Sequence, residues 1–229
     1  MRFFRSHRGS PPLRWLLGAA LLTAGCKDAE SGLTSAAAPS GERQWQAAYA
    51  SEVVSFLPGE GAGFGADRMP DVVLGSPEGG GASAGSLDVL SLGRGGEVVL
   101  RMGREIIDGP GPDFIVFENA FRIAGSTTLY QELGEVAVST DGVSWSAFPC
   151  DPPSGVVDMC AGRTPVLATS SAGVPGSDPA ASGGDAFDLA NVALARARYV
   201  RIRDARFGGP GPTDGFDLDA VAALHGDTP

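Results

Sequence analysis

The sequence predicts an all-β protein built as an antiparallel β-sandwich. From about residue 43 onward, short apolar or alternating runs recur between Gly- and Pro-rich turn signals, which is the pattern of a sandwich rather than of a helical or α/β protein. The chain carries 34 glycines and 17 prolines, and no long stretch has a helical period. Only residues 186–195 could supply a turn or two of helix.

Seven segments are the expected strands of this sandwich. In chain order they are 46–56, 96–102, 113–121, 135–139, 144–148, 197–204 and 215–224. Asp141-Gly142 joins the fourth segment to the fifth, and we expect this pair to supply the positive φ angles of a hairpin turn.

Glu118 is unusual because it lies inside the apolar run 113–121. A buried carboxylate needs a partner, which can be an arginine, backbone amides or a metal ion. We expect an ion pair with one of the arginines between Arg198 and Arg206.

The N-terminus has the organisation of a secretory signal peptide. Four arginines precede an apolar run, residues 15–24, which is too short for the ~20 residues that cross a bilayer. The ending, residues 21–26, resembles a bacterial lipobox, which implies cleavage before Cys26 and a lipid on that cysteine. Lys27 in the next position resembles the lipoproteins that reach the outer membrane. We therefore expect a lipid-anchored protein of the bacterial cell envelope.

The predicted organisation has three parts. Residues 1–25 form the lipoprotein signal peptide, residues 26–42 a flexible tether, and residues 43–229 the β-sandwich domain. The tether is assigned because this segment is small, polar and without periodicity.

Charge and residue content restrict the function. The chain has 17 basic and 27 acidic residues, and loss of the four signal arginines leaves 13 basic residues and a net charge of −14. That charge disfavours nucleic acid and anionic lipid and suits divalent cations or neutral partners such as sugars. His225 would be the one histidine left and Lys27 is the one lysine, so histidine-based and Schiff-base catalysis are disfavoured.

The cysteines follow from the lipobox. With Cys26 lipidated, Cys150 and Cys160 remain in an oxidising compartment. We predict a disulfide between them, closing the Pro-rich loop 151–159 and stabilising the fold by about 2–3 kcal/mol in the loop-closure model.

Several motifs resemble known domains. Residues 138–145 (VSTDGVSW) are similar to the S-x-D-G-x-x-W hairpin of discoidin-like domains, 197–202 to the strand that follows it, and 215–224 to the closing strand of galactose-binding-like jelly rolls. Residues 108–119 also resemble a D-G-P-G-x-D-F-x-V-F-E-N segment of a group of bacterial cell-surface proteins. The resemblance implies an eight-stranded jelly roll that binds glycans or other ligands through loops at one end. It also implies that Trp145 belongs to the core rather than to a sugar-stacking surface.

The same resemblance implies a structural calcium ion. Its position in the last strand makes Asp219, or Asp217 two places earlier, the matching ligand, with Glu52 of the first strand as a partner. Asp113 is a further candidate, because the preceding Gly-Pro-Gly-Pro run holds its carboxylate at a rigid loop end. Calcium takes six to eight oxygen ligands of this kind. The residues predicted to bind the metal are therefore Glu52, Asp113, Asp217 and Asp219.

The function expected from these observations is non-catalytic binding of a surface ligand, with a glycan favoured and calcium as a structural ion. An adhesive protein that binds a protein partner is the first alternative. A hydrolase acting through paired carboxylates is the second, although no acid and base can be identified for it.

Overall fold

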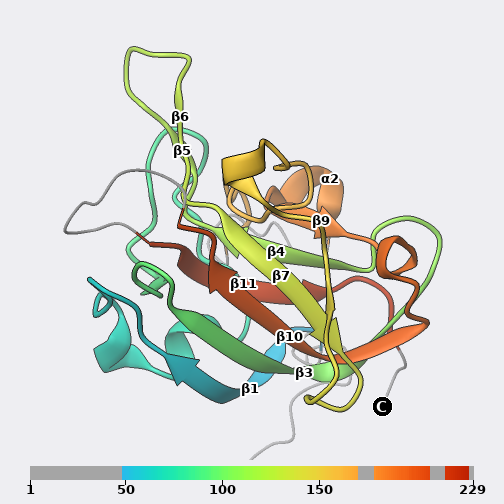
Figure 1. Ribbon diagram of the computed structural model, residues 1–229. Helices are drawn as coiled ribbons and strands as arrows, with labels where there is room; N and C mark the ends of the chain where they lie inside the picture. The colour runs from blue at the N-terminus through green and yellow to red at the C-terminus, as the bar shows by residue number, and fades with distance from the viewer. Residues whose placement is uncertain (1–47, 170–177, 207–214, 227–229) are drawn as a thin grey trace, which may run out of the picture. The chain divides into compact units, whose positions relative to one another are not determined.

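The protein is described by a computed structural model that covers residues 48–169, 178–206 and 215–226. All of these residues belong to one compact unit, Ala38–Pro229. Two antiparallel sheets face each other in this unit (Figure 1). The predicted all-β antiparallel sandwich is therefore confirmed. Cys26 and the predicted signal and tether segments lie outside the described residues, so the predicted domain boundaries remain predictions. Within the described residues, no helix is both long and apolar enough to cross a membrane.

The larger sheet has five strands in the order β1-β3-β10-β7-β8. Its strands are β1 (Ala50–Leu57), β3 (Glu97–Ile107), β7 (Gly134–Ser139), β8 (Ser146–Ala147) and β10 (Arg196–Asp204). Each strand runs antiparallel to its neighbours.

The smaller sheet has four strands in the order β2-β11-β4-β9. Its strands are β2 (Leu90–Ser91), β4 (Phe114–Glu118), β9 (Asp185–Phe187) and β11 (Asp217–Ala223). β11, the last strand in sequence, lies between β2 and β4.

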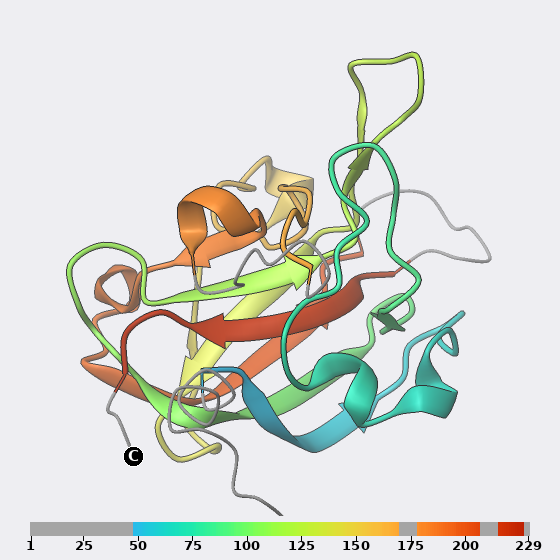
Figure 2. The same ribbon diagram turned by 180° about the vertical axis from the view of Figure 1, so that it is seen from behind.

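The remaining elements are short. A separate hairpin, β5 (Phe121–Arg122) with β6 (Leu129–Tyr130), projects from the sandwich beside the loop that precedes β2 (Figures 1 and 2). The described helical turns are η1 (Ala66–Arg68), η2 (Asp71–Val73), η3 (Pro152–Ser154), η4 (Leu189–Val192) and α2 (Pro179–Ser182).

The core lies between the two sheets and is built by period-two alternation. β3, β10 and β7 contribute apolar side chains from one side, and β4 and β11 from the other. They include Val98, Leu100, Val136, Val138, Val200, Ile202, Phe114, Val116, Leu218 and Val221, which are all fully buried. A second cluster covers the outer face of the smaller sheet and contains Ile115 and Phe117. Both faces of β4 are therefore buried, which explains why its sequence is a continuous apolar run.

The predicted hairpin forms, although its turn differs from the expectation. Gly142 has the left-handed φ of +75°, whereas Asp141 does not and instead accepts hydrogen bonds from the amides of Val143 and Ser144, both at 2.8 Å. These amides, with the Ser139 hydroxyl, lower the pKa of Asp141 to about 2. The aspartate therefore organises the loop through its carboxylate rather than through its backbone.

Two further expectations need correction. Trp145 is half-buried and outside the core, since the Arg201 guanidinium lies 4.7 Å from the centre of its ring on the outer face of the larger sheet. Residues 186–195 form the single turn η4 after β9, because Asp188 caps that turn and Ala193 ends it with a φ of +54°.

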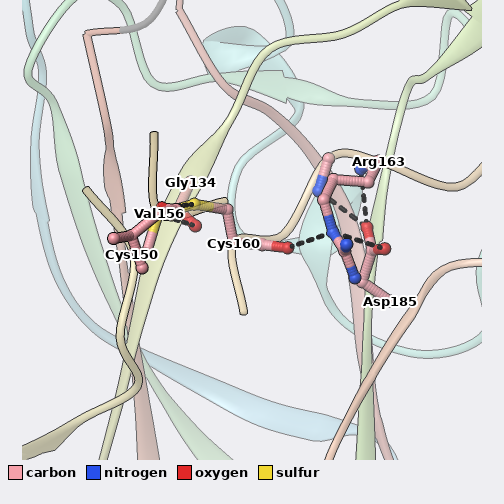
Figure 3. The surroundings of a disulfide bond; sticks show 7 residues. Gly134, Cys150, Val156, Cys160, Arg163 and Asp185 are labelled. Carbon is pink, nitrogen blue, oxygen red and sulfur yellow. Dashed lines mark hydrogen bonds and ion pairs between the residues drawn. A yellow bond between two sulfur atoms is a disulfide. The ribbon is translucent and has the colours of Figure 1, made fainter. Parts of the chain in front are cut away.

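The predicted disulfide between Cys150 and Cys160 is present, with its sulfurs 2.04 Å apart (Figure 3). Cys160 is buried in a small apolar cluster with Leu133 and Ala205. Its main-chain oxygen accepts a hydrogen bond from Nε of Arg163 at 3.1 Å. The disulfide therefore joins the loop after β8 to the segment that leads towards β9.

Candidate functional site

A cavity of about 480 Å³ lies at the end of the smaller sheet where β4 ends and β11 begins. Three separate parts of the chain line it: the loop after β1, the segment leading into β2, and residues beside the sheet ends. The lining residues are Gly61, Ala62, Gly63, Phe64, Ser86, Leu87, Val89, Ser91, Asn119 and Asp217. Phe64 is 50% exposed and Leu87 is 77% exposed, so the apolar side of the cavity is open to solvent.

The wall that carries Phe64 is fixed by main-chain contacts. The Ser91 amide donates to the Phe64 carbonyl oxygen at 3.0 Å. Gly65 has a φ of +76°, and a Cβ at this position would lie 2.0 Å from the Val89 oxygen, so only glycine allows this close approach. Arg68 packs over the Phe64 ring at 5.9 Å and pairs with Asp88. The ring is thereby held at the rim of the cavity.

The opposite wall is held by side chains of the sheet. The Asn119 carboxamide oxygen accepts a hydrogen bond from the Ser86 amide, and the Ser86 hydroxyl donates to the Glu78 oxygen at 2.5 Å. Asp219 accepts the Glu78 amide through both carboxylate oxygens at 3.1 Å. Burial, opposed by that amide, raises the pKa of Asp219 to about 8. Asp219, predicted to bind a metal, lies here as an anchor for the loop before β2.

Asp217 is the carboxylate of the cavity. Burial raises its pKa, while the side chains of Ser91 and Asn119 act in the opposite direction by hydrogen bonding. Oδ1 of Asp217 is buried and has no hydrogen-bond partner among the described residues. The cavity thus combines a carboxylate, a carboxamide and a hydroxyl with one exposed aromatic ring.

The other predicted metal ligands lie elsewhere. Glu52 is exposed on β1 of the larger sheet, with Arg101 at 3.8 Å. Asp113 is fully buried before β4 and holds three segments together. It accepts the Gly109 and Leu189 amides at 2.8 and 2.7 Å, and its Oδ1 lies 2.9 Å from Nδ1 of His225. The structure therefore does not gather the four predicted residues at one place.

Asp113 belongs instead to an acidic triad with Asp108 and Asp188. One carboxylate oxygen from each residue lies within 4.8 Å of the other two, so this group could hold a metal ion. Asp188 also caps η4 by accepting the Ala190 amide at 2.9 Å. In the described part of the chain this triad is the group that fits such a geometric criterion. The sequence analysis included Asp113 among the ligands but chose its partners from other strands.

The expected ion pair of Glu118 is absent from the described residues. The β10 arginines point outward, where Arg196 pairs with Glu105 at 2.9 Å and Arg203 with Glu97 at 3.4 Å. Glu118 is 1% exposed, and neither of its carboxylate oxygens has a hydrogen-bond partner. The prediction was wrong because alternation sends these arginines to the outer face of the larger sheet, whereas Glu118 shares the inward face with Val116.

A second cavity, of about 500 Å³, lies against the larger sheet. Its lining residues are Leu57, Gly95, Glu97, Glu135, Arg203, Asp204, Ala205 and Arg206. Arg203 lies 3.4 Å from Glu97 and 3.7 Å from Glu135, and Asp204 accepts the amides of Gly95 and Phe216. Most of its charged groups already have partners, so this cavity is the weaker candidate.

Comparison with known proteins gives little further guidance. No known protein family and no curated protein matches the sequence. Three solved chains match the structure, and one of them is the C-terminal domain of a chitobiase from Bacteroides fragilis. It is 14% identical, the alignment covers 58% of this chain and 63% of that domain, and the TM-score is 0.31. The chain thus spans less than two thirds of that domain, and a likeness this weak carries no argument.

Proposed function

We propose that this protein is a non-catalytic surface module that binds a neutral glycan in the cavity beside Asn119 and Asp217. One observation carries the proposal: an exposed aromatic ring, Phe64, lies across one cavity from a carboxamide and a carboxylate. A sugar has apolar C–H faces and hydroxyl edges, so it needs both kinds of surface. Ligand sites commonly combine an apolar lining with a few polar groups in this way.

The charge of the chain supports a neutral ligand. Acidic residues outnumber basic residues by 27 to 17, and the cavity itself contributes the Asp217 carboxylate and no basic lining residue. Phosphate-rich or carboxylate-rich partners would be repelled by such a surface. Sugar hydroxyls, by contrast, can donate to the Asp217 carboxylate and accept from the Asn119 amide group.

The attachment to the cell is part of the proposal. A lipid on Cys26 would hold the module at the bacterial membrane, most simply the outer membrane, with residues 26–42 as the tether. The support is the order of basic, apolar and small residues before the cysteine. Labelling with radioactive palmitate should be lost in Cys26→Ser, and labelling that persists would refute the anchor.

Calcium is proposed as a structural ion, with Asp108, Asp113 and Asp188 as the candidate ligands. Hard oxygen ligands of this kind suit calcium. Calcium should then raise the melting temperature above that measured in EDTA, and Asp108→Asn with Asp188→Asn should abolish the shift. Equal melting temperatures with and without calcium would contradict the assignment.

The two alternatives make different demands on the structure. A glycosidase needs two carboxylates facing one cavity, but Asp217 is the one carboxylate among the residues that line the glycan cavity. A protein-binding adhesin would use a broad apolar surface, whereas Phe64 and Leu87 flank a concave site. The geometry therefore favours a small polar ligand.

A glycan array followed by calorimetry with the best hit tests the proposal. Phe64→Ala and Asn119→Ala should each weaken the affinity at least tenfold, because they remove the stacking surface and the hydroxyl-binding amide. Leu57→Ala is the matched control, because it truncates another exposed apolar side chain that lines the second cavity. Loss of binding in Leu57→Ala with retention in Phe64→Ala would place the ligand in the wrong cavity for this proposal.

A further inference from the structure

Glu118 is a buried carboxylate that the glycan cavity does not use. It is the last residue of β4 and points between the sheets, where it is 1% exposed. Both of its carboxylate oxygens lack a hydrogen-bond partner among the described residues. Native proteins pair groups of this kind, because an unpaired buried carboxylate loses its hydration without compensation.

The neighbours of Glu118 make the problem worse. Burial first, and then the charges of Asp217, Glu132 and Asp185, raise its pKa well above the usual value. Neither Glu118 nor Asp217 has an ion pair within the described ranges, and Oδ1 of Asp217 also lacks a hydrogen-bond partner there. Two acids without a counter-charge therefore meet where β4 ends and β11 begins.

Asp185 provides an internal contrast. Its carboxylate accepts the amides of Gly162 and Arg163, both at 2.8 Å, and the hydroxyl of Thr164 at 2.9 Å. The Arg163 guanidinium lies 3.6 Å away (Figure 3). The fold thus surrounds one buried acid of this group with donors and offers none to Glu118.

The space beside Glu118 is kept open by Gly162. This glycine has a φ of +89°, and a Cβ on it would lie 3.4 Å from Oε2 of Glu118 and 2.0 Å from the main-chain oxygen of Glu132. A carboxylate oxygen and a carbonyl oxygen therefore approach the same point. Both are oxygen donors with negative charge, and no side chain can fill the place where they meet.

We propose that this place is a cation site, with calcium the best match, in which Glu118 and the main-chain oxygen of Glu132 are ligands and Asp217 supplies further negative charge. A proton on Glu118 would remove its charge but would still leave a buried donor and acceptor unpaired. Calcium binds carboxylate and carbonyl oxygens together and tolerates irregular geometry, whereas magnesium demands a near-ideal octahedron. The site is separate from the acidic triad and does not depend on glycan binding.

Calorimetric titration of the protein with calcium tests the site. Glu118→Gln should weaken the affinity at least tenfold, since it keeps the size of the side chain but removes its charge. In EDTA the same variant should unfold at or above the temperature of the unchanged protein, because the uncompensated carboxylate is gone. Asp108→Asn is the matched control and should retain the affinity of this site.

Two results would overturn the proposal. One is a calcium affinity that is the same in Glu118→Gln as in the unchanged protein. The other is calcium binding that disappears entirely in Asp108→Asn, which would assign all of it to the triad.

A measurement on the unchanged protein decides the matter if Glu118→Gln does not fold. Crystals soaked in terbium, which replaces calcium at oxygen sites, should give an anomalous peak beside the Glu118 carboxylate. Absence of a peak there, with the metal bound elsewhere, would refute the site.

Discussion

The outer face of the larger sheet and the inner end of the smaller sheet treat charge in opposite ways. On the larger sheet, acids and arginines face one another across neighbouring strands, as in Arg203 with Glu97 and Glu135. At the end of the smaller sheet, Glu118, Asp217 and Asp219 are buried with few donors or none. Pairs on an exposed sheet face mainly keep the surface soluble. Buried acids without counter-charges cost stability, so they indicate a ligand or a fixed structural role.

The largest expected effect of breaking this contrast is at Asp113. Asp113→Ala should lower the free energy of unfolding by roughly 3 kcal/mol, because it leaves two buried amides without an acceptor. Urea unfolding of the variant beside Glu97→Ala measures the difference. A loss at Asp113 no larger than the loss at Glu97 would erase the distinction between the two regions.

The pH dependence should come from the smaller sheet. The folded protein holds the proton of Asp219 up to a pKa of about 8, whereas the unfolded chain releases it near pH 4. Between these values the folded state binds more protons, so the free energy of unfolding falls as pH rises. Asp219→Asn should reduce that slope by up to about 1.4 kcal/mol per pH unit.

Urea midpoints from pH 5 to pH 8.5, in EDTA, provide the measurement for Asp219. Glu118, Asp185 and Asp217 also have raised pKa values, so some slope should remain in the variant. Glu97→Gln is the control and should leave the slope unchanged. A variant at Asp219 with the full slope of the unchanged protein would show that this carboxyl does not titrate as described.

The smallest effect should come from the larger sheet. Arg203→Ala removes two contacts of 3.4 and 3.7 Å, but the arginine side chain is 50% exposed. The free energy of unfolding should therefore fall by about 0.2–1 kcal/mol, and by less at high salt. A loss above about 2 kcal/mol would mean that this face is as important to stability as the buried acids.

Most of the fold could be predicted because alternation and turn residues are local signals. The expected segment 197–204 corresponds to β10 (Arg196–Asp204), and 215–224 to β11 (Asp217–Ala223). β9 was missed because three residues, Asp185–Phe187, are too few to show a period. The disulfide could be predicted because removing Cys26 from the count leaves one pairing.

The candidate site could be predicted only in part. Asp217 and the oddity of Glu118 were visible in the sequence, because an acid inside an apolar run is a strong local signal. Phe64 gave no such signal, since one aromatic in a Gly-rich loop has no period to mark it. Its proximity to Asn119 depends on how two distant loops pack. The partners of Asp113, such as Leu189 and His225, are likewise set by tertiary contacts alone.

The position of β11 has a consequence for how the protein is made. This strand is the last in the chain, yet it lies between β2 and β4 and carries Asp217 and Asp219. A chain that emerges N-terminus first can pair β3 with β1, but it cannot close the smaller sheet until Ala223 is available. A ribosome that stops before β11 therefore releases a chain without a binding cavity, so ligand binding itself would report that synthesis was completed.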